Sequence, residues 1–122
     1  MLSDVILIVE DDERSRKLLR DLLSFHGYRT IEAATGNAGF EMARAELPCL
    51  ILMDIRLPDI DGTEVLELLR DDPSTADIPV LAVTASVMRG DEQHFRRVGF
   101  NGYIPKPIDV VTFPSMVRAY CA

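Results

Sequence analysis

Short uninterrupted apolar runs alternate along the chain with longer segments in which apolar residues recur every three or four positions. Continuous apolar runs are typical of strands that are covered on both faces, as in a parallel sheet between two layers of helices. One further segment, Arg29–Ala33, alternates between apolar and polar residues and suits a strand at the edge of the sheet. The predicted buried strands are Val5–Val9, Cys49–Met53, Val80–Val83 and, more weakly patterned, Gly102–Ile104.

The segments between these strands have the apolar spacing of helices. Asp12 is a suitable N-cap for the first of them, and Gly27 is a suitable C′ residue. We predict helices over Glu13–His26, Asn37–Glu46, Thr63–Asp71, Arg89–Val98 and within Asp109–Tyr120. The inward faces of the first and third are expected to carry Leu18, Leu19, Leu22 and Leu23, and Val65, Leu66, Leu68 and Leu69.

Pro114 restricts where the last helix can begin. In a helix starting at Asp109, its ring would clash with the carbonyl group of Val110. We therefore expect Asp109–Phe113 to form a turn and Pro114 to lie in the first turn of a short helix.

Strand and helix alternate five times, which predicts an α/β fold of the (βα)5 type. The expected structure is a doubly wound five-stranded parallel sheet in the flavodoxin-like order 2-1-3-4-5, with right-handed crossovers and helices on both faces. The five units use all 122 residues, so we expect one domain over residues 1–122 and no output domain.

Composition limits the function. The chain is 48% hydrophobic and 27% charged, as in soluble globular proteins. Its net charge of −7 argues against binding to nucleic acid, which relies on Lys and Arg, and suits a cation or a basic patch on a partner. The longest apolar runs have five residues, whereas a membrane span needs about 20. With no signal peptide visible either, we expect a cytoplasmic protein without a membrane partner.

Cys49 and Cys121 are too few for a disulfide framework or a zinc site. We interpret them as a buried strand thiol and a loose terminal thiol.

Polar residues follow several strands at the point where each strand ends. Glu10 and Asp11 follow the first strand, Asp54 the third, Thr84 the fourth and Lys106 the fifth. Because ligands of open α/β sheets bind outside the carboxyl ends of the strands, we expect these side chains to share one pocket.

Several carboxylates in one cleft repel one another unless a cation joins them, and carboxylate oxygens together with water suit Mg²⁺. We expect Asp11 and Asp54 to be Mg²⁺ ligands, with Glu10 acting through water. A lysine and a threonine hydroxyl can balance an incoming phosphoryl group. This set of groups fits phosphoryl transfer onto an aspartate.

The chain resembles the receiver domains of two-component response regulators over nearly its whole length. Residues Pro79 to Val111 are most similar to stand-alone cell-cycle regulators of the DivK type. The resemblance rests on the order and spacing of Ile6-Leu7-Ile8-Val9-Glu10-Asp11-Asp12, Leu52-Met53-Asp54-Ile55-Arg56-Leu57-Pro58-Asp59-Ile60-Asp61-Gly62, Val83-Thr84-Ala85 and Tyr103-Ile104-Pro105-Lys106-Pro107.

The resemblance implies a role for each of these positions. Asp54 is the implied phosphoryl acceptor, Thr84 the switch hydroxyl, Lys106 the lysine that pairs with the phosphoryl group, and Tyr103 the aromatic residue that turns inward when Thr84 moves. It also implies a cis bond between Lys106 and Pro107, and re-docking of the helix predicted over residues 89–98. The implied Mg²⁺ ligands are Glu10, Asp11, Asp54 and the backbone carbonyl group of Arg56.

The function so implied is a phosphorelay switch rather than an enzyme, although the domain assists its own phosphorylation and dephosphorylation. The donor would be a phosphohistidine on a sensor histidine kinase or a histidine phosphotransfer protein, and the output would be a downstream protein target bound by a monomer or weak dimer. Two alternatives stay open: a receiver-like scaffold that is never phosphorylated, and a metal-dependent phosphatase with turnover.

Overall fold

A five-stranded, all-parallel sheet in the order β2-β1-β3-β4-β5 forms the centre of the molecule. This computed structural model describes residues 4–85 and 91–121. The strands are β1 (Val5–Val9), β2 (Arg29–Ala33), β3 (Leu50–Asp54), β4 (Val80–Thr84) and β5 (Gly102–Pro105). The helices are α1 (Glu13–Phe25), α2 (Gly36–Glu46), α3 (Gly62–Asp71), α4 (Asp91–Val98) and α5 (Phe113–Arg118).

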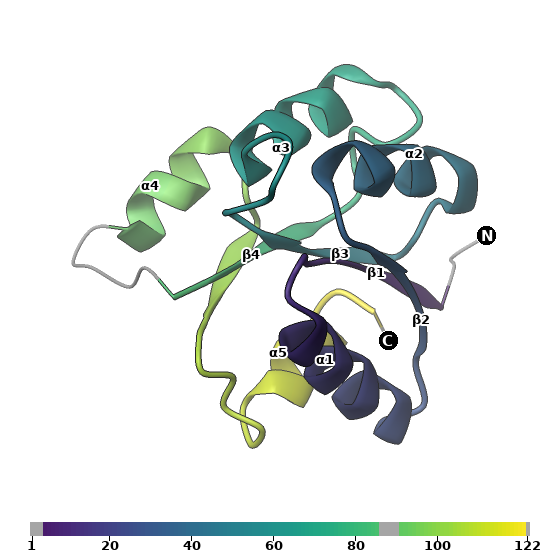
Figure 1. The fold of residues 1–122 in the computed structure, drawn as a ribbon, viewed down its shortest axis with the longest axis vertical. Coiled ribbons are helices and arrows are strands. Elements are labelled where there is room, and N and C mark those ends of the chain that lie inside the picture. The colour runs from purple at the N-terminus through teal and green to yellow at the C-terminus, as the bar shows by residue number, and fades with distance from the viewer. Residues whose placement is uncertain (1–3, 86–90, 122) are drawn as a thin grey trace.

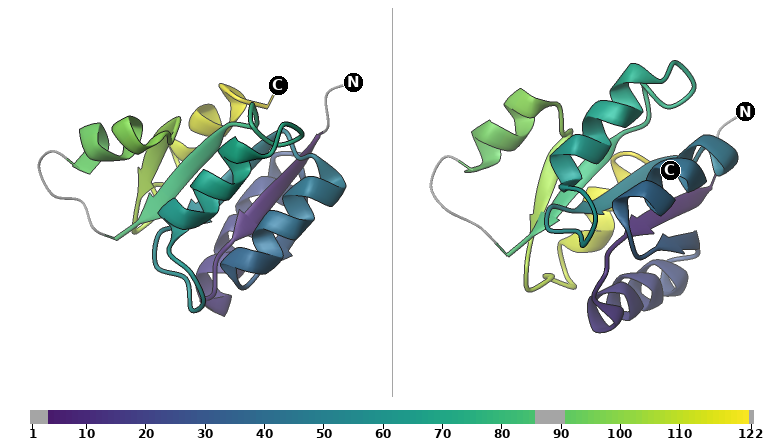
Figure 2. Two further views of the ribbon diagram at one scale, coloured as in Figure 1. Left: turned by 90° about the horizontal axis from the view of Figure 1, so that it is seen from above. Right: turned by 45° about the horizontal axis from the view of Figure 1, so that its top comes forward.

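Helices cover both faces of the sheet, with α2, α3 and α4 on one side and α1 and α5 on the other (Figures 1 and 2). The predicted fold class and strand order are therefore confirmed. The predicted element bounds agree to within one or two residues, except that residues 89–90 of the fourth predicted helix lie outside the described residues. Among the residues that are described, no helix is long and apolar enough to cross a membrane.

The central strands are buried at every position, which explains their continuous apolar runs. Successive side chains point to opposite faces of a strand. Accordingly Leu7 and Val9 join the hydrophobic core under α2, α3 and α4, while Ile6 and Ile8 join the core under α1 and α5. β1 thus contributes side chains to both cores, and the polar residues Glu10 and Asp11 follow after its carboxyl end.

Two predicted inward leucines face solvent instead. Leu18 is 41% exposed and Leu68 is 39% exposed, whereas Leu19, Leu23 and Leu69 are buried. The apolar stripe of a helix is about 100° wide, and both exposed leucines lie on its flank.

Side-chain caps fix the beginnings of the longer helices. Asp12 is the N-cap of α1, as predicted, and its carboxylate accepts a hydrogen bond from the backbone N–H of Ser15 at 3.0 Å. Asp61 caps α3 in the same way. At the other end of α1, Gly27 has a φ of 88°, the left-handed conformation expected of a C′ glycine.

The turn before α5 is also confirmed. The N–H of Phe113 donates to the carbonyl group of Asp109 at 3.0 Å, and Pro114 lies in the first turn of the helix. The helix has six residues and no side-chain cap hydrogen bond at its start. Burial of Phe113 and Val117 against the sheet is therefore its main support.

Arg70 of α3 links three segments of the chain. Its guanidinium donates hydrogen bonds to the carbonyl groups of Ala76 (3.0 Å), Ile78 (2.7 Å) and Gly99 (3.3 Å), and to the side-chain oxygen of Asn101 (3.0 Å). Arg70 thereby connects the end of α3 with the loop before β4 and with the turn between α4 and β5.

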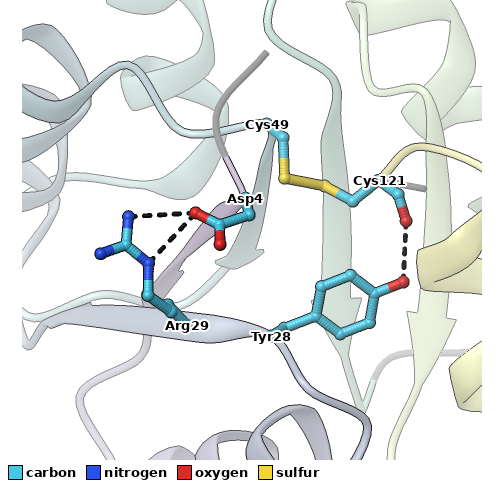
Figure 3. Close-up of a disulfide and its surroundings, with 5 residues drawn as sticks. All are labelled: Asp4, Tyr28, Arg29, Cys49 and Cys121. Atoms are coloured by element: carbon cyan, nitrogen blue, oxygen red, sulfur yellow. Dashed lines mark hydrogen bonds and ion pairs between the residues drawn. A yellow bond between two sulfur atoms is a disulfide. The ribbon is translucent and has the colours of Figure 1, made fainter.

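The prediction of two separate thiols was wrong, because Cys49 and Cys121 form a disulfide (Figure 3). Their Cα atoms are 5.8 Å apart although 72 positions separate them in the sequence. Helix α5 directs the chain back toward the start of β3, and the Tyr28 hydroxyl donates to the carbonyl group of Cys121 at 2.7 Å. Only the fold brings the two cysteines together, so their spacing gave no indication of the bond.

Candidate functional site

Polar side chains converge at the carboxyl edge of the sheet because β1, β3, β4 and β5 all end there. Asp54 ends β3 and Thr84 ends β4, with Asp54 opposite Val83 in the register of the two strands. The edge holds a pocket of about 430 Å³. It is lined by Asp11, Asp54, Arg56, Thr84, Ala85 and Lys106.

Lys106 reaches into this pocket from the loop after β5. Its Nζ atom lies 2.5 Å from Oε1 of Glu10 and 3.8 Å from Oδ2 of Asp54. Its backbone N–H donates to the carbonyl group of Thr84 at 2.8 Å, which fixes the start of the loop. The bond from Lys106 to Pro107 is cis, as predicted. The lysine is therefore placed to neutralise one carboxylate and remains close to a second.

The two buried carboxyl groups have opposite pKa shifts. Burial, together with the neighbouring Glu10, raises the pKa of Asp54 to about 7. Burial would also raise the pKa of Glu10, but hydrogen bonds with Asp54 and Lys106 lower it below the ordinary value. Lys106 thus stabilises the ionised form of Glu10, while the pKa of Asp54 stays near neutral pH. A second cation in the pocket would favour the ionised form of Asp54.

Glu10, Asp11 and Asp54 form a donor set for a metal ion. Each offers a carboxylate oxygen, and these oxygens all lie within 4.8 Å of one another. Glu10 is buried and Asp54 is only 9% exposed, whereas Asp11 is exposed, so water can complete the coordination. Mg²⁺ usually combines one or two carboxylates with several waters, and this all-oxygen set fits it.

The loop between β3 and α3 brings the chain back to the Asp54 backbone at Gly62, the first residue of α3. A Cβ atom at Gly62 would lie 2.5 Å from the carbonyl oxygen of Asp54, so no other residue fits there without displacing the loop. Asp59 joins the same loop to the start of α2, since its carboxylate accepts hydrogen bonds from the N–H groups of Gly36 (2.8 Å) and Asn37 (2.9 Å). Arg56, from this loop, donates its N–H to Oδ1 of Asp54 at 3.2 Å.

Arg16 supports the site but was not predicted from the sequence. Its guanidinium donates to the backbone carbonyl group of Glu10 at 3.0 Å and pairs with Glu32 at 3.2 Å. The available signal was its position four residues after the Asp12 N-cap, which turns its side chain toward the start of the helix.

Tyr103 lies outside the acidic pocket. Its ring is 6.3 Å from that of Phe95 in α4, and it borders a separate groove of about 190 Å³ between α4 and α5. The groove is lined by Leu81, Arg96, Gly102, Tyr103, Met116, Ala119 and Tyr120. The structure thus gathers the acidic residues, Thr84 and Lys106 in one place and puts Tyr103 on the neighbouring surface.

This fold and site agree with known families. Residues 6–118 match the model of the response regulator receiver domain, and the chain belongs to that family. Receiver domains are phosphoacceptor switches of two-component signalling rather than enzymes of the usual kind, and they bind Mg²⁺ at an acidic site.

Particular relatives narrow the comparison. The chain is 46% identical over 115 residues to the polar-differentiation response regulator DivK of Brucella ovis, with 94% of each chain covered. Among solved structures, it is similar to the receiver domain of the sensor histidine kinase PA1611 of Pseudomonas aeruginosa, which has a magnesium ion in its active site cleft (TM-score 0.89, 28% identity, 98% of each chain). It is also similar to a CheY-like receiver domain protein of Methanospirillum hungatei (TM-score 0.83, 29% identity, 98% and 93% coverage).

Proposed function

We propose that this protein is a phosphorelay switch that accepts a phosphoryl group on Asp54 and then changes its partner-binding surface. The observation that carries the proposal is the position of Asp54 in the pocket. Its carboxylate lies beside Glu10 and Asp11, and Lys106 stands 3.8 Å from it. An acceptor carboxylate, a cation site and an ammonium group are the parts that phosphoryl transfer to an aspartate requires.

In the proposed reaction a carboxylate oxygen of Asp54 attacks the phosphorus atom of a phosphohistidine, and the histidine nitrogen leaves with the bonding electrons. Bound Mg²⁺ would neutralise the charge of the carboxylates and the phosphoryl oxygens. Its ligands would be Glu10, Asp11, Asp54 and the Arg56 carbonyl group. Lys106 then exchanges part of its pairing with Glu10 for a phosphoryl oxygen, and the Thr84 hydroxyl donates a second hydrogen bond.

The added group carries a charge of about −1.5 to −2, by analogy with phosphoserine. Reversing a 1:99 equilibrium takes about 5.5 kcal/mol, while one hydrogen bond to a charged group contributes about 1.5–3 kcal/mol. Thr84 and Lys106 must therefore act together. We propose that the shift of Thr84 lets Tyr103 turn inward and that α4, which contacts Tyr103 through Phe95, follows it.

The proposed donors are a sensor histidine kinase or a histidine phosphotransfer protein, and the proposed output is a downstream protein target. A groove of about 170 Å³ next to Lys106 supports docking beside the pocket. Its lining includes the exposed Leu18 of α1 together with Pro107 and Ile108. We further propose that the protein is a cytoplasmic monomer or weak dimer in which residues 1–122 form a single receiver domain.

Incubation with Mg²⁺ and acetyl phosphate tests the acceptor. Intact-protein mass spectrometry should show one phosphoryl group per chain, none in Asp54→Asn, and none when Mg²⁺ is chelated. A chain that gains no phosphoryl group would be a scaffold. Continuous release of phosphate, faster than phosphorylated Asp54 loses its phosphoryl group, would indicate a phosphatase. Either outcome would refute the proposal.

The switch needs its own test. Thr84→Ala should still be phosphorylated but should lose most of the phosphorylation-dependent change in amide NMR shifts around Tyr103. Thr84→Ser keeps the hydroxyl and should retain that change. Equal responses in the two variants would show that the hydroxyl does not transmit the signal.

A further inference from the structure

We propose that Cys49 and Cys121 form a reversible redox site that exchanges with small thiols and disulfides of the glutathione class, and that opening the bond loosens the groove beside Tyr103. The disulfide lies at the amino ends of the strands, next to the start of β3, whereas the acidic pocket lies at their carboxyl ends. The two sites therefore lie at opposite ends of the sheet, and thiol exchange at the disulfide does not require phosphorylation of Asp54.

The two cysteines differ in exposure and in how their backbones are held. Cys49 is partly exposed and its N–H donates to the carbonyl group of Val5 at 2.9 Å, so it is fixed to the sheet. Cys121 is only 4% exposed and lies beyond the last turn of α5. A small thiolate therefore reaches the sulfur of Cys49 more readily, and the sulfur of Cys121 is the leaving group.

The segment that carries Cys121 packs on the sheet through Phe113 and Val117, and few hydrogen bonds join its described residues to other elements. Helix α5 has six residues and lacks a side-chain N-cap. After it, the backbone N–H groups of Tyr120 and Cys121 both donate to the carbonyl group of Val117 (2.9 Å each), and the Tyr28 hydroxyl donates to the carbonyl group of Cys121 (2.7 Å). The disulfide is the covalent attachment of this segment to the sheet, as Figure 3 shows.

The same segment forms one wall of the groove at Tyr103. Met116, Ala119 and Tyr120 line that wall, and Tyr120 directly precedes Cys121. The Tyr120 hydroxyl donates to the carbonyl group of Asn101 at 3.2 Å and closes the wall against the turn before β5. Loss of the covalent attachment thus changes the shape of a surface that contains the proposed switch tyrosine.

The reaction balances as two successive exchanges. A glutathione thiolate attacks Cys49, the Cys49–Cys121 bond breaks, and Cys121 leaves as a thiolate that takes up a proton. A second glutathione thiolate attacks the mixed disulfide and releases Cys49. The protein gains two electrons and two protons, and two glutathione molecules become one disulfide. Because Tyr28 holds the Cys121 backbone nearby, glutathione disulfide can restore the bond by the reverse path.

The test is a glutathione redox titration of the unphosphorylated protein without Mg²⁺. Free thiols are counted by alkylation and intact mass, and amide hydrogen exchange is followed across α5. We expect two thiols to appear together while the fold persists, exchange at Tyr120 and Cys121 to rise about tenfold or more, and both changes to reverse on reoxidation. A bond that survives until the whole protein unfolds would overturn the proposal, and so would opening without any change in exchange near Tyr103 and Tyr120.

Variants separate this proposal from a merely structural disulfide. The double variant Cys49→Ser, Cys121→Ser should resemble the reduced protein and ignore the redox buffer. Tyr28→Phe keeps the ring but loses the hydroxyl, and should lower the ratio of disulfide to dithiol by about twofold to tenfold. An unchanged ratio would contradict the positioning role of Tyr28. Asp54→Asn should titrate like the wild type, so failure of the phosphoryl proposal leaves this result intact.

Discussion

Replacing Asp54 by Asn should increase the free energy of unfolding of the Mg²⁺-free protein at pH 8 and change it little at pH 4. The pKa of Asp54 is raised from 3.8 to about 7 by burial and by Glu10. Between these two pH values the folded protein keeps a proton that the unfolded chain has released. Stability is therefore lost as the pH rises from about 4 to about 7, and a neutral amide avoids this loss.

The pKa difference of about 3 units sets a ceiling of about 4 kcal/mol, at 1.36 kcal/mol per unit. Two features reduce it: solvent screens charges at the open side of the pocket, and the lowered pKa of Glu10 contributes stability in the opposite direction. We expect Asp54→Asn to gain about 2 kcal/mol at pH 8.

Urea unfolding at pH 4, 6 and 8 with a chelator measures this difference. Added Mg²⁺ should stabilise the wild type more than the variant and so reduce the difference between their free energies of unfolding. The bound cation offsets the repulsion between Asp54 and Glu10 in the wild type, and this repulsion is already absent in the variant. A gain of equal size at all three pH values would refute the reasoning, as would a loss at pH 8.

Asp59→Asn is the matched control, because the same change is made in an exposed aspartate of the neighbouring loop. Hydrogen bonds from the backbone N–H groups of Asn37 and Gly36 lower the pKa of Asp59. Its ionised form is thus favoured in the folded state. Asp59→Asn should lower stability at pH 8, the opposite sign to Asp54→Asn, and the effect should fade as the pH falls through the lowered pKa.

Three further predictions concern the lysine, the loop and the disulfide. Lys106→Met should raise the pKa of Asp54 above about 7 by removing the nearest cation, measurable by carbon NMR of the carboxyl group; an unchanged pKa would contradict the pairing. Gly62→Ala should cost about 1–3 kcal/mol of stability in urea unfolding, because its Cβ would lie 2.5 Å from a backbone oxygen, and a neutral result would show that the loop yields freely. Reduction of the Cys49–Cys121 disulfide should lower the free energy of unfolding by about 4 kcal/mol, because the bond closes a loop of 72 residues in the unfolded chain. A decrease below about 1 kcal/mol would show that the two cysteines stay close together in the reduced, unfolded chain.

The fold was predictable because local patterns and architecture agree. Each buried strand is a continuous apolar run, Asp12 marks the start of α1, and Pro114 sets the start of α5. The convergence of Asp54, Thr84 and Lys106 also followed, since parallel strands end at the same edge of the sheet.

What the sequence could not show are contacts between distant segments. The pairing of Cys49 with Cys121 depends on the path of α5, and the contact of Arg16 with the Glu10 carbonyl group depends on the angle at which α1 leaves β1. Leu18 has the residue type of a core position, yet its place on the flank of α1 leaves it exposed. Residue type predicts burial only when the direction of the side chain is known as well.

The contacts of Arg70 limit how α4 can be displaced. The guanidinium holds the Gly99 carbonyl group just after α4 and is itself anchored to the loop before β4. A rigid helix that is fixed at one end moves farthest at its other end when it tilts. Any tilt of α4 therefore displaces its beginning, at Asp91, more than its end. A partner protein that distinguishes two positions of α4 is expected to bind near that beginning.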